Sequence, residues 1–390
     1  MNVTETLRTF TDFFCDRGHQ LVPGGTLIPA SGDPVLFTTS GMHPLTPYLE
    51  GRGHPQGRRL TSVQRCLRTT DIDEVGDQSH LTVFEMLGTW SLGDYPGTQS
   101  LRWGLELICD GFGISRKRLH ATVFGGDGQL GEDRELRETW AELGVPVELT
   151  GEENWWSNGP TGLCGPDSEL FIWTGTGPPQ GTPSDDDRWM ELWNHVMMRY
   201  RRLSDGSLQP LAQPNVDTGM GLERLLMIVQ GKPSVFDCDV LEPWMTALAQ
   251  LWSPGEHELR LLSDHLRASV VIIGDGVRPA NTGRGYVLRR LIRRALTALW
   301  QDGSSRTLAD LPAGLPERTM GHFGQEPGAA EIRRVLLDEE RRFGELLSRG
   351  RTVLSRGRYE GGLSEQQLRY LHDTHGLPRE LVAVLQSEPR

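Results

Sequence analysis

Residues 62–87 have the sequence SVQRCLRTTDIDEVGDQSHLTVFEML, which contains two runs typical of β-strands. The runs cover residues 62–67 and 81–87, and the loop Thr69–Ser79 between them is short enough for the two strands to pair in an antiparallel ladder. This pairing would place Arg68 and Phe84 on neighbouring strands. The local sequence therefore predicts an antiparallel sheet that brings a cation and an aromatic ring close together.

Further strand-like and helical runs surround this pair in an irregular order. Strands are expected at residues 35–38, 120–124, 146–149, 169–173, 190–200 and 211–216. Helices are expected at residues 132–143 and at residues 4–17, where Thr4 could cap the start and Gly18 could end the helix. Because the strands cluster and do not alternate regularly with helices, we expect an α+β fold with an antiparallel sheet flanked by helices.

The pattern changes near residue 242, after which only helices are expected. Apolar residues recur with helical spacing at residues 259–273, 284–300, 329–354 and 364–375. We therefore expect two domains: residues 1–241, which contain the sheet, and residues 242–390, which are all helical. Residues 174–187, TGTGPPQGTPSDDD, are expected to form a flexible insertion in the first domain.

The composition excludes several classes of protein. The chain has 390 residues and a formal net charge of −12, so its surface as a whole would not attract nucleic acid. Its apolar runs are far shorter than the roughly 20 residues of a membrane helix, and its polar N-terminus does not resemble a signal peptide. We therefore expect a cytoplasmic protein with no membrane partner. The five cysteines form no C-x-x-C pair, which argues against a disulfide framework and a zinc ribbon.

Two common nucleotide-binding patterns are not supported. Lysine occurs at only two positions, and Lys232 lacks the glycine that a P-loop requires five residues before its Gly-Lys pair. The G-x-G-x-x-G pattern of residues 126–131 follows a predicted strand, as a dinucleotide fingerprint would. Asp127 and Glu132 crowd the place of the pyrophosphate, however, and their charge would repel it.

Three separated segments together fit the binding of a nucleoside triphosphate without a P-loop. Arg68 could clamp a phosphate in a fixed fork, and the Phe84 ring could stack on adenine. In the third segment, DTGMGLER (residues 217–224), two glycines lead into a helix expected at residues 222–229, with Arg224 in its electropositive first turn. Singly, each arginine would more often form a surface ion pair, and Phe84 would more often fill a core.

Together these segments resemble the three motifs of class II aminoacyl-tRNA synthetases, and the similarity is greatest to the alanyl-tRNA synthetases. The resemblance covers nearly the whole chain in order. The matching motifs are GH (18–19), LFTTSGM (36–42), DIDEVG (71–76), FEMLG (84–88), SLGDY (91–95), CGP (164–166), ELWN (191–194), DTGMGLER (217–224), DHLR (264–267), DGV (275–277), GYVLRR (285–290) and DT (373–374).

The resemblance implies a set of ATP contacts. Arg68 would hold the α-phosphate and Arg224 would pin the triphosphate tail, and these two are the expected catalytic residues. Phe84 would stack on adenine, and His80 would lie near the outer phosphates. The expected ATP-binding residues are Arg68, His80, Phe84, Glu85, Met86, Gly221 and Arg224. Mg²⁺ would accompany ATP, with Glu191 as a candidate ligand.

The resemblance also implies a pocket for a small carboxylic or amino acid. Asp217 would accept the amino group of the substrate, Gly219 would lie beneath the substrate, and Trp156 and Val196 would form walls. The expected acid-binding residues are Met42, Trp156, His195, Val196, Asp217 and Gly219.

Three positions near this pocket depart from the family pattern. Asp167 stands where the family shows cysteine, His195 where it shows an aliphatic residue, and Trp173 where it shows an acidic residue. If these side chains face the pocket, they suggest a more polar substrate. The alternative is neutral drift, with His195 facing away from the pocket.

The sequence leaves two alternatives for the acceptor of the activated acid, tRNA and a small molecule. Arginines crowd residues 284–294 and suit phosphate contacts, and Asn281 and Asp373 match positions at which the family reads the tRNA acceptor stem. The possible acceptor-binding residues are Asn281, Arg289, Arg290, Arg293 and Asp373. The net charge of −12 and the lack of the family's editing and C-terminal domains favour a small-molecule amine or hydroxyl acceptor instead.

We therefore expect an ATP-dependent ligase that activates a small amino-bearing carboxylic acid as an acyl-adenylate and transfers it to a small-molecule acceptor. One alternative is a minimal alanine–tRNA ligase without editing, and a second is a non-catalytic regulator built on the same fold. Because Arg68, Asp217 and Arg224 are all retained, the sequence favours catalysis over the regulator.

Overall fold

The computed structural model describes residues 1–30, 35–301, 305–326, 328–355, 359 and 362–387. The chain divides into two compact units. Unit 1 consists of Met1–Leu67 and Phe84–Pro233, and unit 2 consists of Arg68–Val83 and Ser234–Arg390. Arg68–Val83, which we call the 68–83 segment, therefore belongs to unit 2 although unit 1 flanks it on both sides in the sequence.

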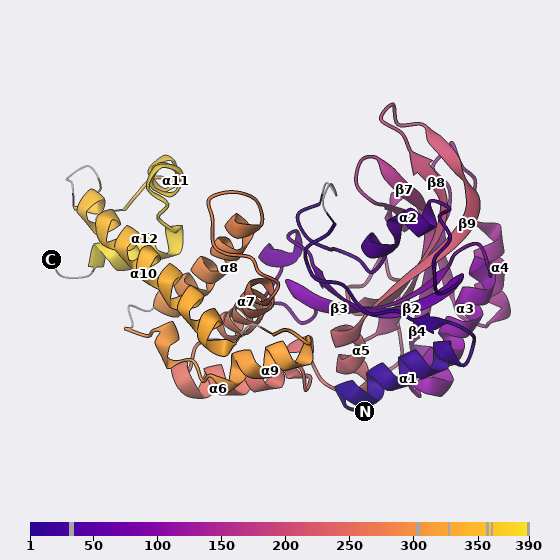
Figure 1. Ribbon diagram of the computed structural model, residues 1–390, viewed down its shortest axis with the longest axis horizontal. Helices are drawn as coiled ribbons and strands as arrows, with labels where there is room; N and C mark the ends of the chain where they lie inside the picture. Colours follow the sequence, from indigo (N-terminus) through magenta and orange to yellow (C-terminus); the bar gives the residue numbers. More distant parts are fainter. Residues whose placement is uncertain (31–34, 302–304, 327, 356–358, 360–361, 388–390) are drawn as a thin grey trace. The chain divides into compact units, whose positions relative to one another are not determined.

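Unit 1 is built on a mixed β-sheet (Figure 1). In the described residues this sheet has nine strands in the order β1-β2-β3-β9-β8-β7-β4-β5, with β6 paired to β7. The pairs joining β3, β9, β8, β7 and β4 are antiparallel, whereas β1 with β2 and β4 with β5 are parallel. The predicted α+β class with a largely antiparallel sheet is therefore confirmed. The strands are β1 (Gln20–Leu21), β2 (Arg59–Leu67), β3 (Val83–Ser91), β4 (Leu119–Phe124), β5 (Val147–Thr150), β6 (Trp155–Ser157), β7 (Gly162–Trp173), β8 (Trp189–Arg202) and β9 (Leu208–Gly221).

The two faces of the sheet are covered differently. Helices α1, α3 and α4 lie on one face, and the short α2 lies against the other (Figure 1). The helices of unit 1 are α1 (Val3–Cys15), α2 (Thr46–Leu49), α3 (Gly97–Glu106), α4 (Arg134–Glu142) and α5 (Leu222–Val229). The contacts agree with this arrangement, because Phe10 and Phe14 of α1 pack on Trp193 of β8 with ring centroids 6.1 and 6.2 Å apart.

The first helix has a different cap from the predicted one. Asn2, not Thr4, is the N-cap: its side chain accepts a hydrogen bond from the Glu5 backbone N–H at 2.9 Å, and the Glu5 carboxylate accepts one from the Asn2 N–H at 2.9 Å. This reciprocal capping box satisfies two backbone donors at once, which a threonine two residues later could not do.

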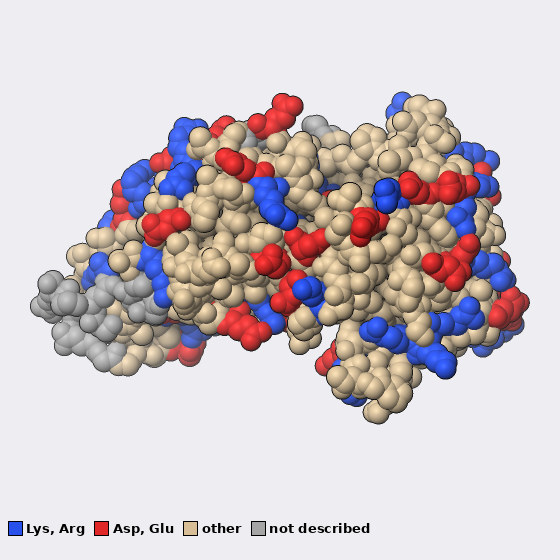
Figure 2. All heavy atoms as spheres, turned by 90° about the horizontal axis from the view of Figure 1, so that it is seen from below, with Lys and Arg blue, Asp and Glu red and all other residues tan. Residues whose placement is uncertain are grey.

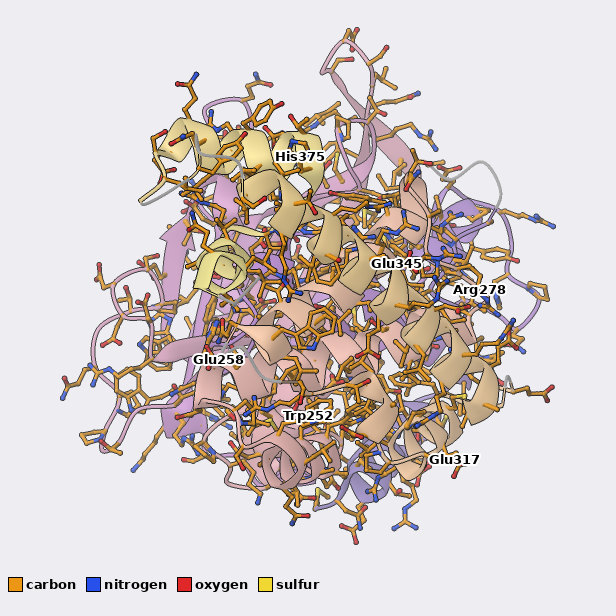
Figure 3. All side chains as sticks on the ribbon, turned by 90° about the vertical axis from the view of Figure 1, so that its left-hand side faces the viewer. Trp252, Glu258, Arg278, Glu317, Glu345 and His375 are labelled. Carbon is orange, nitrogen blue, oxygen red and sulfur yellow. The ribbon has the colours of Figure 1, made fainter. Side chains whose placement is uncertain are left out.

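Unit 2 contains no strand among its described residues from 234 onward. Its helices are α6 (Glu242–Trp252), α7 (Glu256–Gly274), α8 (Gly283–Trp300), α9 (Gly314–His322), α10 (Ala329–Leu354), α11 (Glu365–His375) and α12 (Arg379–Ser387). Glu317 on α9 and Glu345 on α10 are exposed, whereas Trp252 at the end of α6 is buried (Figure 3). No helix in the described part of the chain has the length and apolarity of a membrane span.

Helix α7 forms the centre of unit 2. Every residue from Leu261 to Ile273 is buried, and this run includes Asp264, His265 and Arg267. A helix buried on all sides is usually apolar, because an unpaired charge inside a protein is costly. These three polar residues must therefore find partners within the unit.

Some local predictions do not agree with the structure. Residues 35–38 form bends and no strand. β9 runs past the predicted end at residue 216 through Gly221, because its backbone pairs with β3 on one side and β8 on the other. The expected insertion at residues 174–187 is the connection between β7 and β8, where Gln180 accepts a hydrogen bond from the Trp189 indole at 3.0 Å.

Candidate active site

The register of three central strands sorts the predicted site residues onto two faces of the sheet. Asp217 on β9 lies opposite Trp90 on β3 and Val196 on β8, and Gly219 lies opposite Gly88 and Asn194. Residues directly opposite in an antiparallel pair point to the same face, so these six share one face, which we call the pocket face. The intervening residues point to the other face, which α1, α3 and α4 cover and which we call the helix face.

The pocket face has an apolar wall of the predicted composition. Met42 and Val196 are buried in one cluster with Trp90, and Trp156 packs against this cluster. A cavity of about 350 Å³ adjoins it, and its lining includes Gly41 and Trp90. The structure therefore brings together Met42, Trp156 and Val196, three of the residues expected to hold the side chain of the acid.

Two glycines let large side chains lie flat on the pocket face. A Cβ atom at Gly219 would come within 2.7 Å of the Met86 Sδ atom, and a Cβ atom at Gly88 would come within 2.3 Å of the Trp90 ring. Met86 also accepts a hydrogen bond on its sulfur from the Gly41 N–H at 3.3 Å. Met86 and Trp90 therefore form a floor beside Asp217 that a larger residue at either glycine would disrupt.

Asp217 is almost fully buried at the end of this floor, with 6% of its surface exposed. Burial raises the pKa of Asp217 to about 7, and the neighbouring Trp90 indole partly offsets this effect. A cation placed next to the carboxylate would favour its ionised form. The position is therefore suited to an ammonium group, as expected for an amine anchor.

Asn194 presents a further acceptor on the same face. Its side-chain nitrogen donates to Asp167 Oδ2 at 2.9 Å and to Glu169 Oε1 at 3.2 Å, and Asp167 Oδ1 accepts from Asn154 at 2.8 Å. Because the Asn194 nitrogen faces the two carboxylates, the Asn194 oxygen points away from them. This oxygen is buried without a hydrogen-bond partner. Burial raises the pKa of Asp167 to about 7, although these two amides lower it. Asp167 pairs with Val196, so it shares the pocket face and fixes the Asn194 amide there.

His195 does not belong to this pocket, and its expected acid-binding role is corrected. It alternates with Asn194 and Val196, so its ring lies on the helix face, where Nδ1 bonds the Ser100 hydroxyl of α3 at 3.0 Å. Burial lowers the pKa of His195 to about 3, so the ring is neutral. Trp173 likewise packs on Trp189, with centroids 5.2 Å apart, at the end of β7.

Arg224 and Glu191 are close together. Arg224 lies in the first turn of α5 and donates from Nη1 to the Glu191 backbone oxygen at 2.9 Å and to its carboxylate at 3.1 Å. Gly221, the N-cap of α5, is paired with Met86 of β3. The expected clamp for the triphosphate tail and the expected Mg²⁺ ligand therefore lie side by side in unit 1.

The other expected ATP residues are divided between the faces and the units. Phe84 and Met86 alternate with Glu85 along β3, so the Glu85 side chain points to the helix face, and the Glu85 backbone N–H donates to the Glu223 carboxylate at 3.0 Å. Arg68 and His80 belong to unit 2. Among the described residues, no group of three or more His, Cys, Asp or Glu side chains could hold a metal ion. A single carboxylate is nevertheless sufficient as the protein ligand of Mg²⁺ when phosphates of the substrate supply other ligands.

His80 is held in a polar turn of the 68–83 segment. Its Nδ1 bonds Asp77 Oδ2 at 2.6 Å, and Asp77 Oδ1 accepts from the N–H groups of Ser79 and His80 at 3.0 and 2.8 Å. Burial would raise the pKa of Asp77, but these hydrogen bonds outweigh it and lower the pKa to about 2. Asp77 therefore stays ionised and orients the imidazole.

The possible acceptor-binding arginines pair with acids of unit 2. Arg289 and Arg293 pair with the buried Glu339 of α10 at 3.2 and 2.8 Å, and Arg290 contacts both carboxylate oxygens of Asp73 at 2.9 Å. On the face that Figure 2 shows, acidic and basic side chains are interspersed in the same way. Asn281 accepts a hydrogen bond from Arg289, and Asp373 is largely exposed on α11 beside His372. These arginines therefore stabilise unit 2, whatever else they bind.

The sequence reasoning did not identify two residues of the pocket face, Trp90 and Asn194. Trp90 is two residues beyond Gly88 of the FEMLG motif, and Asn194, which ends the ELWN motif, is two residues before the expected pocket residue Val196. The period of two in a strand was the signal that could have identified them.

Comparison with known proteins gives consistent matches. The family model of class II tRNA synthetases (A) matches residues 5–389. The alanine–tRNA ligase of Rubrobacter xylanophilus is 39% identical over 421 residues, covering 100% of this chain and 47% of its own length. That of Treponema pallidum is 40% identical over 411 residues, covering 96% and 67% respectively. A solved structure, histidyl-tRNA synthetase from S. aureus, aligns with a TM-score of 0.38 and 12% identity over 64% of this chain and 76% of its own. The chain thus spans about half to two thirds of the length of these curated relatives.

Proposed function

The chain belongs to the class II tRNA synthetases (A), as an alanyl-tRNA-synthetase-like member, and we propose that it activates alanine with ATP and transfers the alanyl group to tRNA. The observation that carries the proposal is the row formed by Trp90, Asp217 and Val196, which places a buried carboxylate beside a small apolar wall. Such a pocket suits an amino acid with a very short side chain.

The first step needs positioning and charge but no general base. The carboxylate of alanine is already a nucleophile, so its oxygen attacks the α-phosphorus while the bond to pyrophosphate breaks. Asp217 would anchor the ammonium group, and Met42, Trp156 and Val196 would exclude longer side chains. One extra methylene in such a pocket is worth only about 1–3 kcal/mol, so discrimination by size alone is modest.

The charge of the triphosphate would be balanced by groups from several segments. Arg68 would hold the α-phosphate, His80 the outer phosphates and Arg224 the tail, while Phe84 would stack on adenine. Mg²⁺ bound to the phosphates would spread the developing negative charge, with Glu191 as its protein ligand. Preorganised positive groups of this kind supply much of the rate in phosphoryl chemistry.

The names of the relatives support tRNA as the acceptor. They therefore favour the alternative of an alanine–tRNA ligase over the expected ligase with a small-molecule acceptor. Of the three departures that suggested a more polar substrate, His195 lies on the helix face, and Trp173 packs on Trp189 at the end of β7. Asp167 remains, so a ligase with a more polar acid and a small-molecule acceptor is the second candidate. We keep residues 1–241 as the proposed adenylating domain and residues 242–390 as the proposed acceptor domain.

ATP–pyrophosphate exchange with a panel of small amino acids tests the first step, and charging of alanine-specific tRNA tests the second. We expect exchange that depends on alanine, efficient charging, and loss of both in the Arg68→Ala variant. Exchange with a polar acid and no charging would support the second candidate. Silence with every acid would contradict both and favour the non-catalytic regulator.

A further inference from the structure

The 68–83 segment is joined to α7 by a fully buried contact. Thr82 donates its backbone N–H to Asp264 Oδ1 at 2.8 Å and its hydroxyl to Asp264 Oδ2 at 2.5 Å. Thr82 is 0% exposed and Asp264 is 1% exposed. Both oxygens of one buried carboxylate are therefore used to hold a single residue of the segment.

The carboxylate is balanced by neighbours in unit 2. Asp264 Oδ2 also bonds His265 Nδ1 at 2.8 Å, and the other ring nitrogen of His265 bonds Arg294 of α8 at 3.2 Å. Removing one member of such a buried network leaves the others without partners, which is why networks of this kind fix a geometry strictly.

Other residues of α7 and α8 bind the same segment. Arg267 donates to the Val83 carbonyl at 2.8 Å, and Arg260 donates to the Asp77 carbonyl at 3.0 Å. Arg290 and Arg294 pair with Asp73 at 2.9 and 2.7 Å. Polar residues along two helices therefore converge on one short segment, although an apolar α7 would fill the core at less electrostatic cost.

The held residue is directly linked to Arg68. The carbonyl of Thr82 accepts a hydrogen bond from the Arg68 N–H at 3.1 Å, so the two ends of the segment are tied together at the point that Asp264 fixes. A guanidinium can bind a phosphate bidentately only if its backbone is held in place.

We propose that Asp264 is a positioning residue for Arg68, and that α7 and α8 form the frame that holds the 68–83 segment ready for ATP. This inference rests on the proposed function, because it assigns Arg68 to the α-phosphate. Asp264 acts through Thr82 and does not itself touch ATP. Substitutions that weaken this frame should therefore raise the KM for ATP and leave the KM for alanine nearly unchanged.

The test compares two matched variants of the full chain. Thr82→Val removes the hydroxyl that Asp264 holds and keeps the side-chain shape and the N–H bond. Thr319→Val removes another buried hydroxyl of unit 2, which accepts the Trp244 indole N–H at 3.0 Å and does not touch the segment. Asp264→Asn and Asp264→Ala complete the series, because asparagine keeps one acceptor oxygen and alanine keeps none.

We expect the KM for ATP in pyrophosphate exchange to rise about three-fold in Thr82→Val and about ten-fold or more in Asp264→Ala, with Asp264→Asn between them. The KM for alanine should stay within about two-fold throughout. Hydrogen exchange in the 68–83 segment should accelerate in the same order, and Thr319→Val should lower thermal stability without either effect.

The outcomes separate this inference from the proposed function. If the wild type shows no exchange with any amino acid, the proposed function fails, while the hydrogen-exchange series still measures whether Asp264 holds the segment. If the wild type is active and Thr82→Val and Asp264→Asn behave like Thr319→Val, the positioning role is refuted. An equal rise in the KM for ATP and for alanine would also refute it, because that pattern reflects general loss of structure.

Discussion

At the scale of single residues, the pocket face depends on carboxylates that are costly to bury. Asp217 on β9 and Asp167 on β7 flank Val196 of β8 from either side, and burial raises the pKa of each to about 7. A protein keeps such groups where their charge is needed for a ligand or where they orient another side chain. Asp217 suits the first role, and Asp167, which holds Asn194, suits the second.

The first prediction concerns the pH dependence of stability. Between about pH 4 and pH 7 the folded chain keeps a proton on Asp217 that the unfolded chain, with its usual pKa of 3.8, releases. The contribution of Asp217 to the free energy of unfolding therefore falls as pH rises through this window and is constant above it. The side chain of the Asp217→Asn variant cannot ionise. The melting temperature of this variant minus that of the wild type should therefore increase from pH 5 to pH 8. Differential scanning calorimetry checks this, and a constant difference would contradict it.

The same variant gives a second prediction, on substrate binding. An ammonium group needs the ionised carboxylate, so the KM of the wild type for alanine should fall as pH rises through about 7. Asp217→Asn should raise this KM about 100-fold and abolish the dependence, because a buried charge would lose its partner. Steady-state exchange rates measure both effects. The KM for ATP serves as the control, and a comparable rise in it would count against the amine-anchor role.

Asp167 and His195 allow a third prediction with its own control. Asp167→Asn leaves a single acceptor for the amides of Asn154 and Asn194, so Asn194 should lose its fixed orientation and the KM for alanine should rise about ten-fold. His195→Leu changes the next residue on β8 after Asn194, but on the helix face, and should leave this KM within about two-fold. Steady-state kinetics of the two variants measure both values, and an equal change in the KM for alanine would contradict the separate faces assigned to Asp167 and His195.

At the scale of secondary-structure elements, the sequence predicted the positions of strands and helices better than the residues that they contact. The period of two along β8 already separates His195 from Asn194 and Val196, so the facing-away alternative could be stated in advance. Helix α3 was missed because Gly97 and Gly104 weaken its helical signal, although Leu101 and Leu105 are buried. The bond between Thr82 and Asp264 joins residues 182 positions apart, and no local pattern carries such information.

The packing of β3 against β9 gives a fourth prediction. Gly88→Ala would place a Cβ atom 2.3 Å from the rigid Trp90 ring, whereas Gly219→Ala would place one 2.7 Å from the flexible Met86 side chain. Overpacking costs about 1–3 kcal/mol, and we expect Gly88→Ala at the upper end and Gly219→Ala at the lower end. Urea unfolding measures both, and adding Trp90→Phe to Gly88→Ala should recover part of the loss. The reverse order would contradict the assignment of Trp90 and Met86 as the floor.

At the scale of the whole molecule, the division of the chain differs from a simple succession of domains. The 68–83 segment leaves unit 1 after β2, belongs to unit 2, and returns to unit 1 at β3. A chain cut at the boundary that the sequence suggested, residue 241, would separate this segment from Asp264, Arg267 and Arg290. The segment that carries Arg68 would then lose the helices that hold it, although every residue of unit 1 would still be present.

The fifth prediction follows from this division. In a fragment of residues 1–241, the 68–83 segment should be open to proteolysis, because its hydrogen-bond partners on α7 and α8 are gone. Endoproteinase Glu-C should cleave after Glu74 at least about ten-fold faster in the fragment than in the full chain. Cleavage after Glu153, which is exposed in unit 1, should proceed at the same rate in both and serves as the internal control. If Glu74 is equally protected in the fragment, unit 1 alone orders the segment, and the helices of unit 2 are not its frame.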